Sequence, residues 1–228
     1  MVDGTASSHR TSLIMTLRAL LLAATATVVQ LAAAQSVGET PSRTIKIGKA
    51  EVTALAIAPK NDRVLVGTNN GAVLHEIESG KKLYAFAYGE DGATAVYHVG
   101  FNDNGEFVVL IGPSGKRTVW SAAKGQQEKV ITPHRWIPDP RAVKAMGLEM
   151  SNSAFDRFYQ QKEVVLGDVT VRAAKKGVVE FVGADGKVVR TITVPENKDQ
   201  HHQAPLLLWE NQLLIGTDDG RVLFYDVL

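Results

Sequence analysis

The sequence predicts an all-β fold in which a unit of four short antiparallel strands recurs about four times. The first observation is a near-repeat: residues 67–74 read GTNNGAVL, and residues 216–223 read GTDDGRVL. An apolar run precedes each copy, so a strand, a tight turn with a glycine and a second strand are encoded twice. The second observation is the regular spacing of such units. Self-similarity at a period of about 40 residues indicates a repeat architecture.

The first two units follow the pattern closely. The first is expected to form strands at 52–58, 63–68, 72–77 and 81–87, separated by turn-forming clusters such as Pro59–Asp62 and Asn69–Gly71. The second is expected to form strands at 94–101, 106–112, 116–122 and 126–131. Four antiparallel strands within about 40 residues are typical of one blade of a β-propeller.

The third unit is longer. We expect its strands at 143–150, 163–171, 178–182 and 187–194, with residues 152–161 as an insertion between the first two. The glycines that open the third strands are separated by 44, 62 and 43 residues, and the longest interval falls in this unit. These glycines are Gly71, Gly115, Gly177 and Gly220.

The fourth unit has three strands, expected at 205–209, 212–217 and 221–227, and the sequence ends where its fourth strand is due. An unassigned strand, 43–47, precedes the first unit. We therefore predict a small β-propeller of about four blades, closed by the N-terminal strand completing the C-terminal blade, which also removes an unpaired sheet edge. The alternatives are a gene fragment, a coincidental β-rich tail and an eight-bladed ring of two chains. The single ring is favoured because the spare strand supplies what the last blade lacks.

The units resemble WD40-like or quinoprotein-like β-propeller repeats over most of the chain after residue 35. The resemblance lies in the pattern of strands and turns. WD40 units commonly carry Trp-Asp at the end of the third strand, where this sequence has His75-Glu76, Trp120-Ser121 and Tyr225-Asp226. The polar network of a typical WD40 blade is therefore not expected. Members of the family commonly have seven blades, whereas this chain has about four.

Residues 1–34 are expected to be a signal peptide. Arg18 precedes an apolar run at 19–31, and Ala32–Ala34 form a cleavage site of the A-x-A type. Residues 1–14 are polar, so translation is expected to start at Met15. The mature chain would comprise a short linker, 35–42, and the propeller domain, 43–228, in the periplasm or the secreted space. The alternative is an uncleaved N-terminal anchor, although the run is shorter than the roughly 20 residues of a membrane span.

Composition narrows the classes of partner. The formal net charge is +1, which gives no reason to expect nucleic acid or acidic lipid as the partner. The sequence has no cysteine, which excludes disulfides, thiol catalysis and thiolate metal sites. We expect no cofactor, no stable membrane insertion after signal cleavage, and a monomer, with a homodimer as the alternative.

The candidate binding surface is the end of the blades where the hairpins between second and third strands meet the connections between blades. Loops on a rigid scaffold are common binding sites. Among the loop residues, Arg135 and Trp136 are of the types enriched among residues that dominate binding energies. The alternative role for Trp136 is to fill the space between two blades as a buried side chain. The partner-binding residues expected here are His134, Arg135, Trp136, Asn69, Asn70, Asp218 and Asp219.

A metal site is a weaker hypothesis at Asp199, His201 and His202. Imidazole and carboxylate suit zinc, but adjacent side chains of an extended segment point apart. A solvated polar loop is therefore the favoured interpretation of this segment.

Two functions follow. The first is a non-enzymatic exported scaffold that binds a protein or peptide, since no nucleophile, phosphate-binding or zinc-protease motif is present in the sequence. The alternative is a quinoprotein-like or lactonase-like enzyme, or a cofactor or metal binder, with a site at the central mouth that would use residues such as Asp139, Asp168 and Asp199. A structural role in an envelope assembly is not distinguished from the first.

Overall fold

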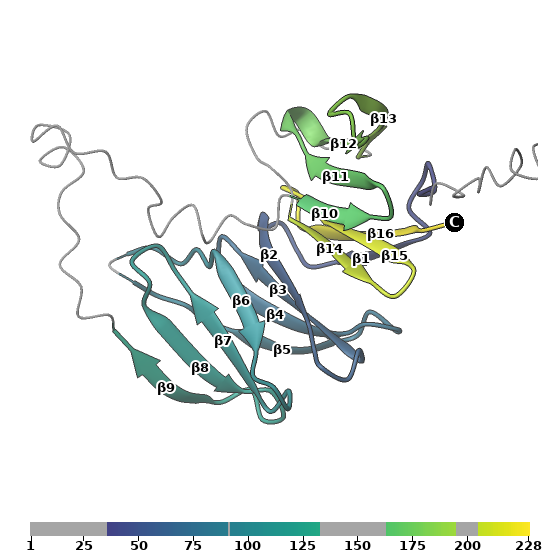
Figure 1. The fold of residues 1–228 in the computed structure, drawn as a ribbon. Helices are drawn as coiled ribbons and strands as arrows, with labels where there is room; N and C mark the ends of the chain where they lie inside the picture. The colour runs from purple at the N-terminus through teal and green to yellow at the C-terminus, as the bar shows by residue number, and fades with distance from the viewer. Residues whose placement is uncertain (1–35, 91, 133–162, 195–204) are drawn as a thin grey trace, which may run out of the picture. The chain divides into compact units, whose positions relative to one another are not determined.

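The computed structural model describes residues 36–90, 92–132, 163–194 and 205–228. All of them belong to one compact unit, Gln35–Leu228, while a second unit, Met1–Ala34, lies outside the described residues. The described residues form sixteen strands in four antiparallel sheets, together with one 3-10 turn, η1 (Lys175–Gly177) (Figure 1). Within these ranges, no helix has the length and apolar character needed to cross a bilayer.

Each sheet has four strands and is one blade, numbered here in chain order. Blade 1 contains β2 (Val52–Ile57), β3 (Arg63–Thr68), β4 (Gly71–Glu76) and β5 (Lys82–Phe86). Blade 2 contains β6 (His98–Phe101), β7 (Phe107–Ile111), β8 (Arg117–Ser121) and β9 (Gln127–Ile131). Blade 3 contains β10 (Glu163–Leu166), β11 (Val169–Ala173), β12 (Val178–Val182) and β13 (Val188–Thr193). Blade 4 contains β14 (Leu206–Trp209), β15 (Gln212–Gly216), β16 (Arg221–Asp226) and β1 (Arg43–Lys46). The chain therefore has the predicted all-β propeller architecture.

The N-terminal strand completes the last blade, as predicted. β1 pairs antiparallel with β16, and the register sets Arg43 opposite Phe224 and Lys46 opposite Arg221. Before β1, residues expected to be a linker also join this blade. Val37 forms a bridge with Val227 and is 1% exposed, so this part of the 35–42 segment belongs to the core.

The front of blade 3 differs from the prediction. The run 163–171, expected as one strand, is a hairpin in which β10 and β11 flank a turn at Gly167 and Asp168. Gly167 has φ +57°, in the left-handed region that glycine adopts readily. Valines on both sides of the turn obscured it in the sequence. Blade 3 is thus complete without 143–150, and both that expected strand and the expected insertion at 152–161 lie outside the described residues.

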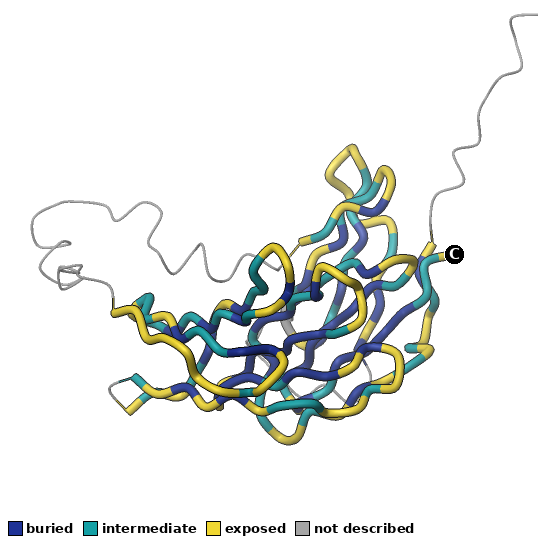
Figure 2. Tube along the Cα trace, turned by 90° about the horizontal axis from the view of Figure 1, so that it is seen from below, coloured by how far each residue is buried: buried dark blue, intermediate teal, exposed yellow. Residues whose placement is uncertain are grey.

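The core lies between neighbouring blades. Alternate residues of each inner strand point to opposite faces, so Val108 and Leu110 of β7 are buried against blade 1. One cluster joins blades 1 and 2, a second joins blades 4 and 1, and a third joins blades 3 and 4. No cluster of the described residues joins blades 2 and 3. Figure 2 shows the buried residues gathered in the interior of the trace and exposed residues at its turns. The outermost strand of blade 2, β9, is exposed along its whole length.

The glycines that open the third strands are required by the geometry. Gly71 has φ +80°, and a Cβ there would lie 2.4 Å from the carbonyl oxygen of Phe86. Gly220 has φ +81°, and its Cβ would lie 2.6 Å from the carbonyl oxygen of Gly48. Both positions combine a left-handed backbone with a close approach of another chain segment, which only glycine accommodates. This explains why the repeat preserves glycine at these places.

Candidate functional site

The hairpins between second and third strands lie at one end of the blades, here called the hairpin face. The amide of Asn69 donates to the carbonyl of Glu51, and the amide of Val52 donates to the carbonyl of Thr217. The turns of blades 1 and 4 therefore both attach to the segment that leads into β2. Thr94, in the connection from blade 1 to blade 2, donates its hydroxyl to the carbonyl of Asn69 (3.0 Å). The turns and the connection thus form one surface, as the sequence predicted.

The connection between blades 1 and 2 is held by a buried tyrosine. The hydroxyl of Tyr88 lies 2.6 Å from the Glu90 carboxylate and 3.0 Å from the carbonyl of Lys116. The same carboxylate accepts the backbone N–H of Ser114, in the hairpin of blade 2. Burial, and then the adjacent Glu90 carboxylate, raise the pKa of Tyr88 far above its ordinary value, so the hydroxyl remains a donor at neutral pH. This contact fixes the hairpin of blade 2 on the hairpin face.

The polar turn residues predicted to bind a partner have distinct roles. Asn69 and Asn70 are exposed at their turn. Asp219 accepts a hydrogen bond from Arg221 Nε (2.8 Å) and one from the Thr217 hydroxyl. Partial burial alone would raise the pKa of Asp219, but these two donors hold it below its ordinary value. One carboxylate oxygen of Asp218 is buried without a partner among the described residues.

Several predicted residues lie outside the described residues. These are His134, Arg135 and Trp136, the metal candidates Asp199, His201 and His202, and Asp139. Asp168 is in the β10–β11 turn. Among the described residues, no group of three or more His, Cys, Asp or Glu side chains could hold a metal ion.

The residues at the Trp-Asp positions do not form a repeated polar network. His75 Nδ1 lies 2.9 Å from the carbonyl oxygen of Gly80, whereas Trp120 donates its indole N–H to the hydroxyl of Thr118 (3.0 Å). The hydroxyl of Tyr225 is buried without a partner in the described part of the chain. Blades 1, 2 and 4 therefore use this position differently, as the departures from Trp-Asp in the sequence indicated.

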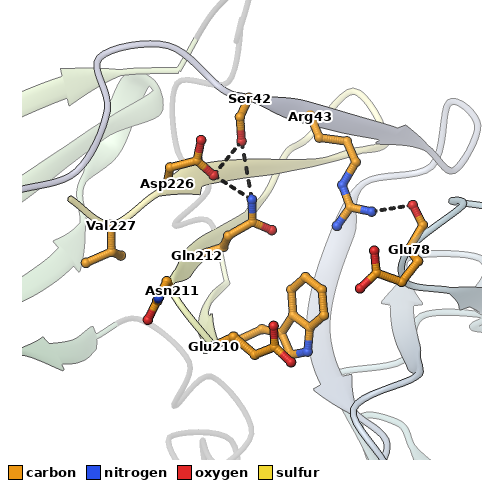
Figure 3. Close-up of a pocket in the computed structure, with 9 residues that line it drawn as sticks. Ser42, Arg43, Glu78, Glu210, Asn211, Gln212, Asp226 and Val227 are labelled. Atoms are coloured by element: carbon orange, nitrogen blue, oxygen red, sulfur yellow. Dashed lines mark hydrogen bonds between the residues drawn. The ribbon is translucent and has the colours of Figure 1, made fainter.

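A pocket of about 580 Å³ opens at the opposite end of the blades, between blades 4 and 1 (Figure 3). It is formed by the start of β1, the end of β16, the β14–β15 turn and the turn that follows β4. This volume is in the range of small-molecule and peptide side-chain pockets. We call it the seam pocket, because it lies where the N-terminal strand completes the last blade. It is lined by Ser42, Arg43, Glu78, Trp209, Glu210, Asn211, Gln212, Asp226 and Val227.

Arg43 is the cation of the seam pocket. Its guanidinium carbon lies 3.9 Å from the ring centroid of Phe224 and 5.8 Å from that of Trp209. Nη1 donates to the carbonyl oxygens of Ile77 and Glu78, the latter at 2.7 Å. Cation–π contacts therefore hold this side chain on blade 4, and charge-assisted hydrogen bonds tie it to the turn of blade 1.

The facing wall is a hydrogen-bonded group of three side chains. Asp226 Oδ1 accepts from the hydroxyl of Ser42 (2.8 Å) and from the Gln212 amide nitrogen (2.6 Å). The bonds from Gln212 and Ser42 lower the pKa of Asp226, so this carboxyl is ionised at neutral pH. Figure 3 shows the three side chains gathered on the side of the pocket that faces Arg43.

The sequence did not single out the seam pocket. Ser42 and Asp226 are 184 residues apart, and no local motif connects them. The predicted pairing of 43–47 with 221–227 did bring the start of one strand close to the end of the other, which is where the pocket lies. What was missing is the register, which the structure supplies.

Comparisons with known proteins find similar chains among solved structures. No protein-family model and no curated protein matches the chain. Among solved structures, one described as the structure of U3-55K is 12% identical, with a TM-score of 0.38, and the match covers 81% of this chain and 55% of that one. A crystal structure of RRP9 WD40 repeats is also 12% identical, with a TM-score of 0.38, and the match covers 82% of this chain and 56% of that one. The chain thus spans little more than half the length of either structure.

Proposed function

We propose that this chain is an exported, non-enzymatic scaffold that binds a protein or peptide partner. The observation that carries the proposal is the seam pocket, where a stacked arginine faces a fixed group of polar side chains. Arginine and tryptophan are enriched at the centres of protein interfaces, because they combine a large packing surface with hydrogen-bonding capacity. Side chains that are already fixed lose little conformational entropy on binding.

The hairpin face is the second surface of the proposal. Its described turns are attached to one another by backbone and side-chain hydrogen bonds, so a partner would meet a fixed set of groups. The proposed contact residues Asn69 and Asn70 are exposed there. His134, Arg135 and Trp136, which lie outside the described residues, stay predicted contact residues on the sequence alone.

Site-directed photo-crosslinking tests the proposal. A photoreactive amino acid is placed at Glu210 on the rim of the seam pocket, at Asn70 on the hairpin face, and at Lys187 in the exposed β12–β13 turn as the control. The protein is expressed in its native host and irradiated in the envelope fraction. A discrete adduct from Glu210 or Asn70 that is absent from Lys187 is the expected result. Equal labelling from all three positions, or no adduct from any, would contradict a specific partner.

Export is the other part of the proposal. The basic residue, apolar run and small-residue site within residues 1–34 support it. N-terminal sequencing of the protein recovered from its native compartment should begin at Gln35. If the recovered protein still contains residues 19–31, the segment is not cleaved, and the protein is either anchored by it or not exported.

A further inference from the structure

The guanidinium of Arg43 is only partly used by the fold. Nη1 makes both hydrogen bonds to the turn after β4, and the structure gives none for Nε or Nη2. No carboxylate of the described residues lies within ion-pair distance of this side chain. Figure 3 shows the remainder of the guanidinium turned away from Glu78 and toward the side of the pocket that holds Gln212. A fixed pair of N–H groups is therefore directed into a pocket.

The free side of the guanidinium, with its Nε and Nη2 groups, suits one kind of ligand group. The planar Nε and Nη2 groups match the two oxygens of a carboxylate, and the resulting bidentate pair is among the strongest polar contacts in proteins. The contact with Phe224 and the two hydrogen bonds of Nη1 restrain the guanidinium, so a ligand would meet a preformed fork. A lysine at this position would offer charge without that geometry.

The facing wall complements the fork. The amide nitrogen of Gln212 is used by Asp226 and Ser42, which leaves its carbonyl oxygen as an acceptor. A peptide that inserts a carboxylate toward Arg43 can donate a backbone N–H to this oxygen. The pocket therefore offers donors on one wall and an acceptor on the other.

The rim restricts the ligand further. Glu78 comes from blade 1 and Glu210 from blade 4, and both are exposed. Their charges and that of the ionised Asp226 oppose a strongly acidic ligand but favour positive groups on both sides of the inserted carboxylate. A chain terminus has neighbours on one side only, whereas an internal acidic residue has neighbours on both.

We propose, on the basis of the binding function above, that the seam pocket binds an internal Asp or Glu side chain of a partner segment with flanking Lys or Arg residues. The Arg43 Nε and Nη2 groups hold the carboxylate, the Gln212 carbonyl oxygen accepts an adjacent backbone N–H, and Glu78 and Glu210 face the basic flanks.

The test uses three tripeptides and the ¹⁵N–¹H NMR signals of Arg43 Nε–H and the Gln212 side-chain amide in the mature chain. The first is N-acetyl-Lys-Glu-Lys amide, the second is N-acetyl-Lys-Gln-Lys amide, and the third is N-acetyl-Lys-Gln-Lys with a free C-terminal carboxylate. We expect the first to shift both signals saturably at millimolar concentration and the second to bind at least tenfold more weakly. Equal responses to the first two peptides, or none, would overturn the proposal. Binding of the third peptide alone would overturn the assignment to a side chain.

Two variants locate the contact. Arg43→Lys should weaken binding of the glutamate peptide at least tenfold although the charge remains, whereas Arg190→Lys, in blade 3 and outside the seam pocket, should bind the peptide like wild type. Unchanged binding by Arg43→Lys would contradict the fork. If this variant does not fold, the comparison of the first two peptides on wild-type protein still decides the question.

The outcome is separable from that of the proposed function. If a partner is crosslinked from Glu210 but this crosslink is unaffected by 10 mM glutamate peptide, the carboxylate pocket is wrong and the scaffold function stands. If the peptide binds through Arg43 but no partner is crosslinked, the pocket stands and the scaffold function fails.

Discussion

Arg43 and Phe224 are directly opposite each other in the register between β1 and β16, and the guanidinium carbon lies 3.9 Å from the phenyl centroid. One cross-strand pair thus joins the start of the fold to its end. The same arginine donates to carbonyls of the turn after β4, so it also ties blade 4 to blade 1.

Removal of β1 should destabilise the fold. A chain that starts at Gly48 loses Val37 and Ile45, which are 1% and 4% exposed, and leaves β16 as an unpaired edge. We expect a lower melting temperature and association of the protein in size-exclusion chromatography. A chain that starts at Gln35 is the control. Equal melting temperatures for the two would show that strand pairing at the seam contributes nothing.

The stacked arginine should contribute to stability through its shape. Arg43→Lys keeps the charge but loses the planar contact with Phe224 and the hydrogen bonds to two carbonyls. We expect a loss of about 1–3 kcal/mol in the free energy of unfolding, measured by urea denaturation. Arg190→Lys is the matched control, because Arg190 lies farther from its ring, 5.4 Å from the Phe181 centroid. A larger loss at Arg190 would refute this account.

Substitution by alanine should destabilise the fold much more at a repeat glycine than at another glycine with a left-handed backbone. Gly71→Ala places a methyl group against the carbonyl of Phe86, so we expect a loss of about 3 kcal/mol or more. Gly186 has a similar φ, +78°, but no atom lies within 4 Å of the place that a methyl group would occupy there. Gly186→Ala should therefore lose only about 1–2 kcal/mol. Equal losses in thermal unfolding would show that the close contact at Gly71 relaxes freely.

Stability should fall in mild acid because of His75. This side chain is 3% exposed, and burial lowers its pKa below the ordinary 6.5, more than the bond to Gly80 raises it. The unfolded chain therefore takes up a proton more readily than the folded chain. This contribution to stability is fully present above pH 6.5 and is lost progressively as pH falls below it.

His75→Asn tests that dependence, because the amide N–H can still reach the carbonyl of Gly80. Melting temperatures of the variant should change less between pH 7.5 and 5 than those of wild type. Burial and then Arg117 also lower the pKa of His98, so the double variant with His98→Asn should be flatter still. An unaltered pH profile in both variants would assign acid sensitivity to other groups.

The strand pattern was predictable because it depends on local features. Alternating apolar residues, turn clusters and glycines before the third strands located most strands to within a residue or two, and the spare strand at 43–47 identified its partner. The prediction for the front of blade 3 was wrong because Gly167 and Asp168 form a tight turn inside a run rich in valine. The apolar pattern continues across this turn and does not show where one strand ends and the next begins.

The sequence by itself determined the repeat and the strands of blades 1, 2 and 4, because each unit is encoded by residues close together in the chain. The pairing of the first strand with the last followed from the count, since one strand was spare and one blade lacked a strand. The seam pocket was decided only by the tertiary structure. It needs the register of β1 on β16 and the approach of the blade 1 turn, which together bring Ser42, Arg43, Gln212 and Asp226 to one place. Distances between side chains from distant segments depend on packing, which local sequence patterns do not specify.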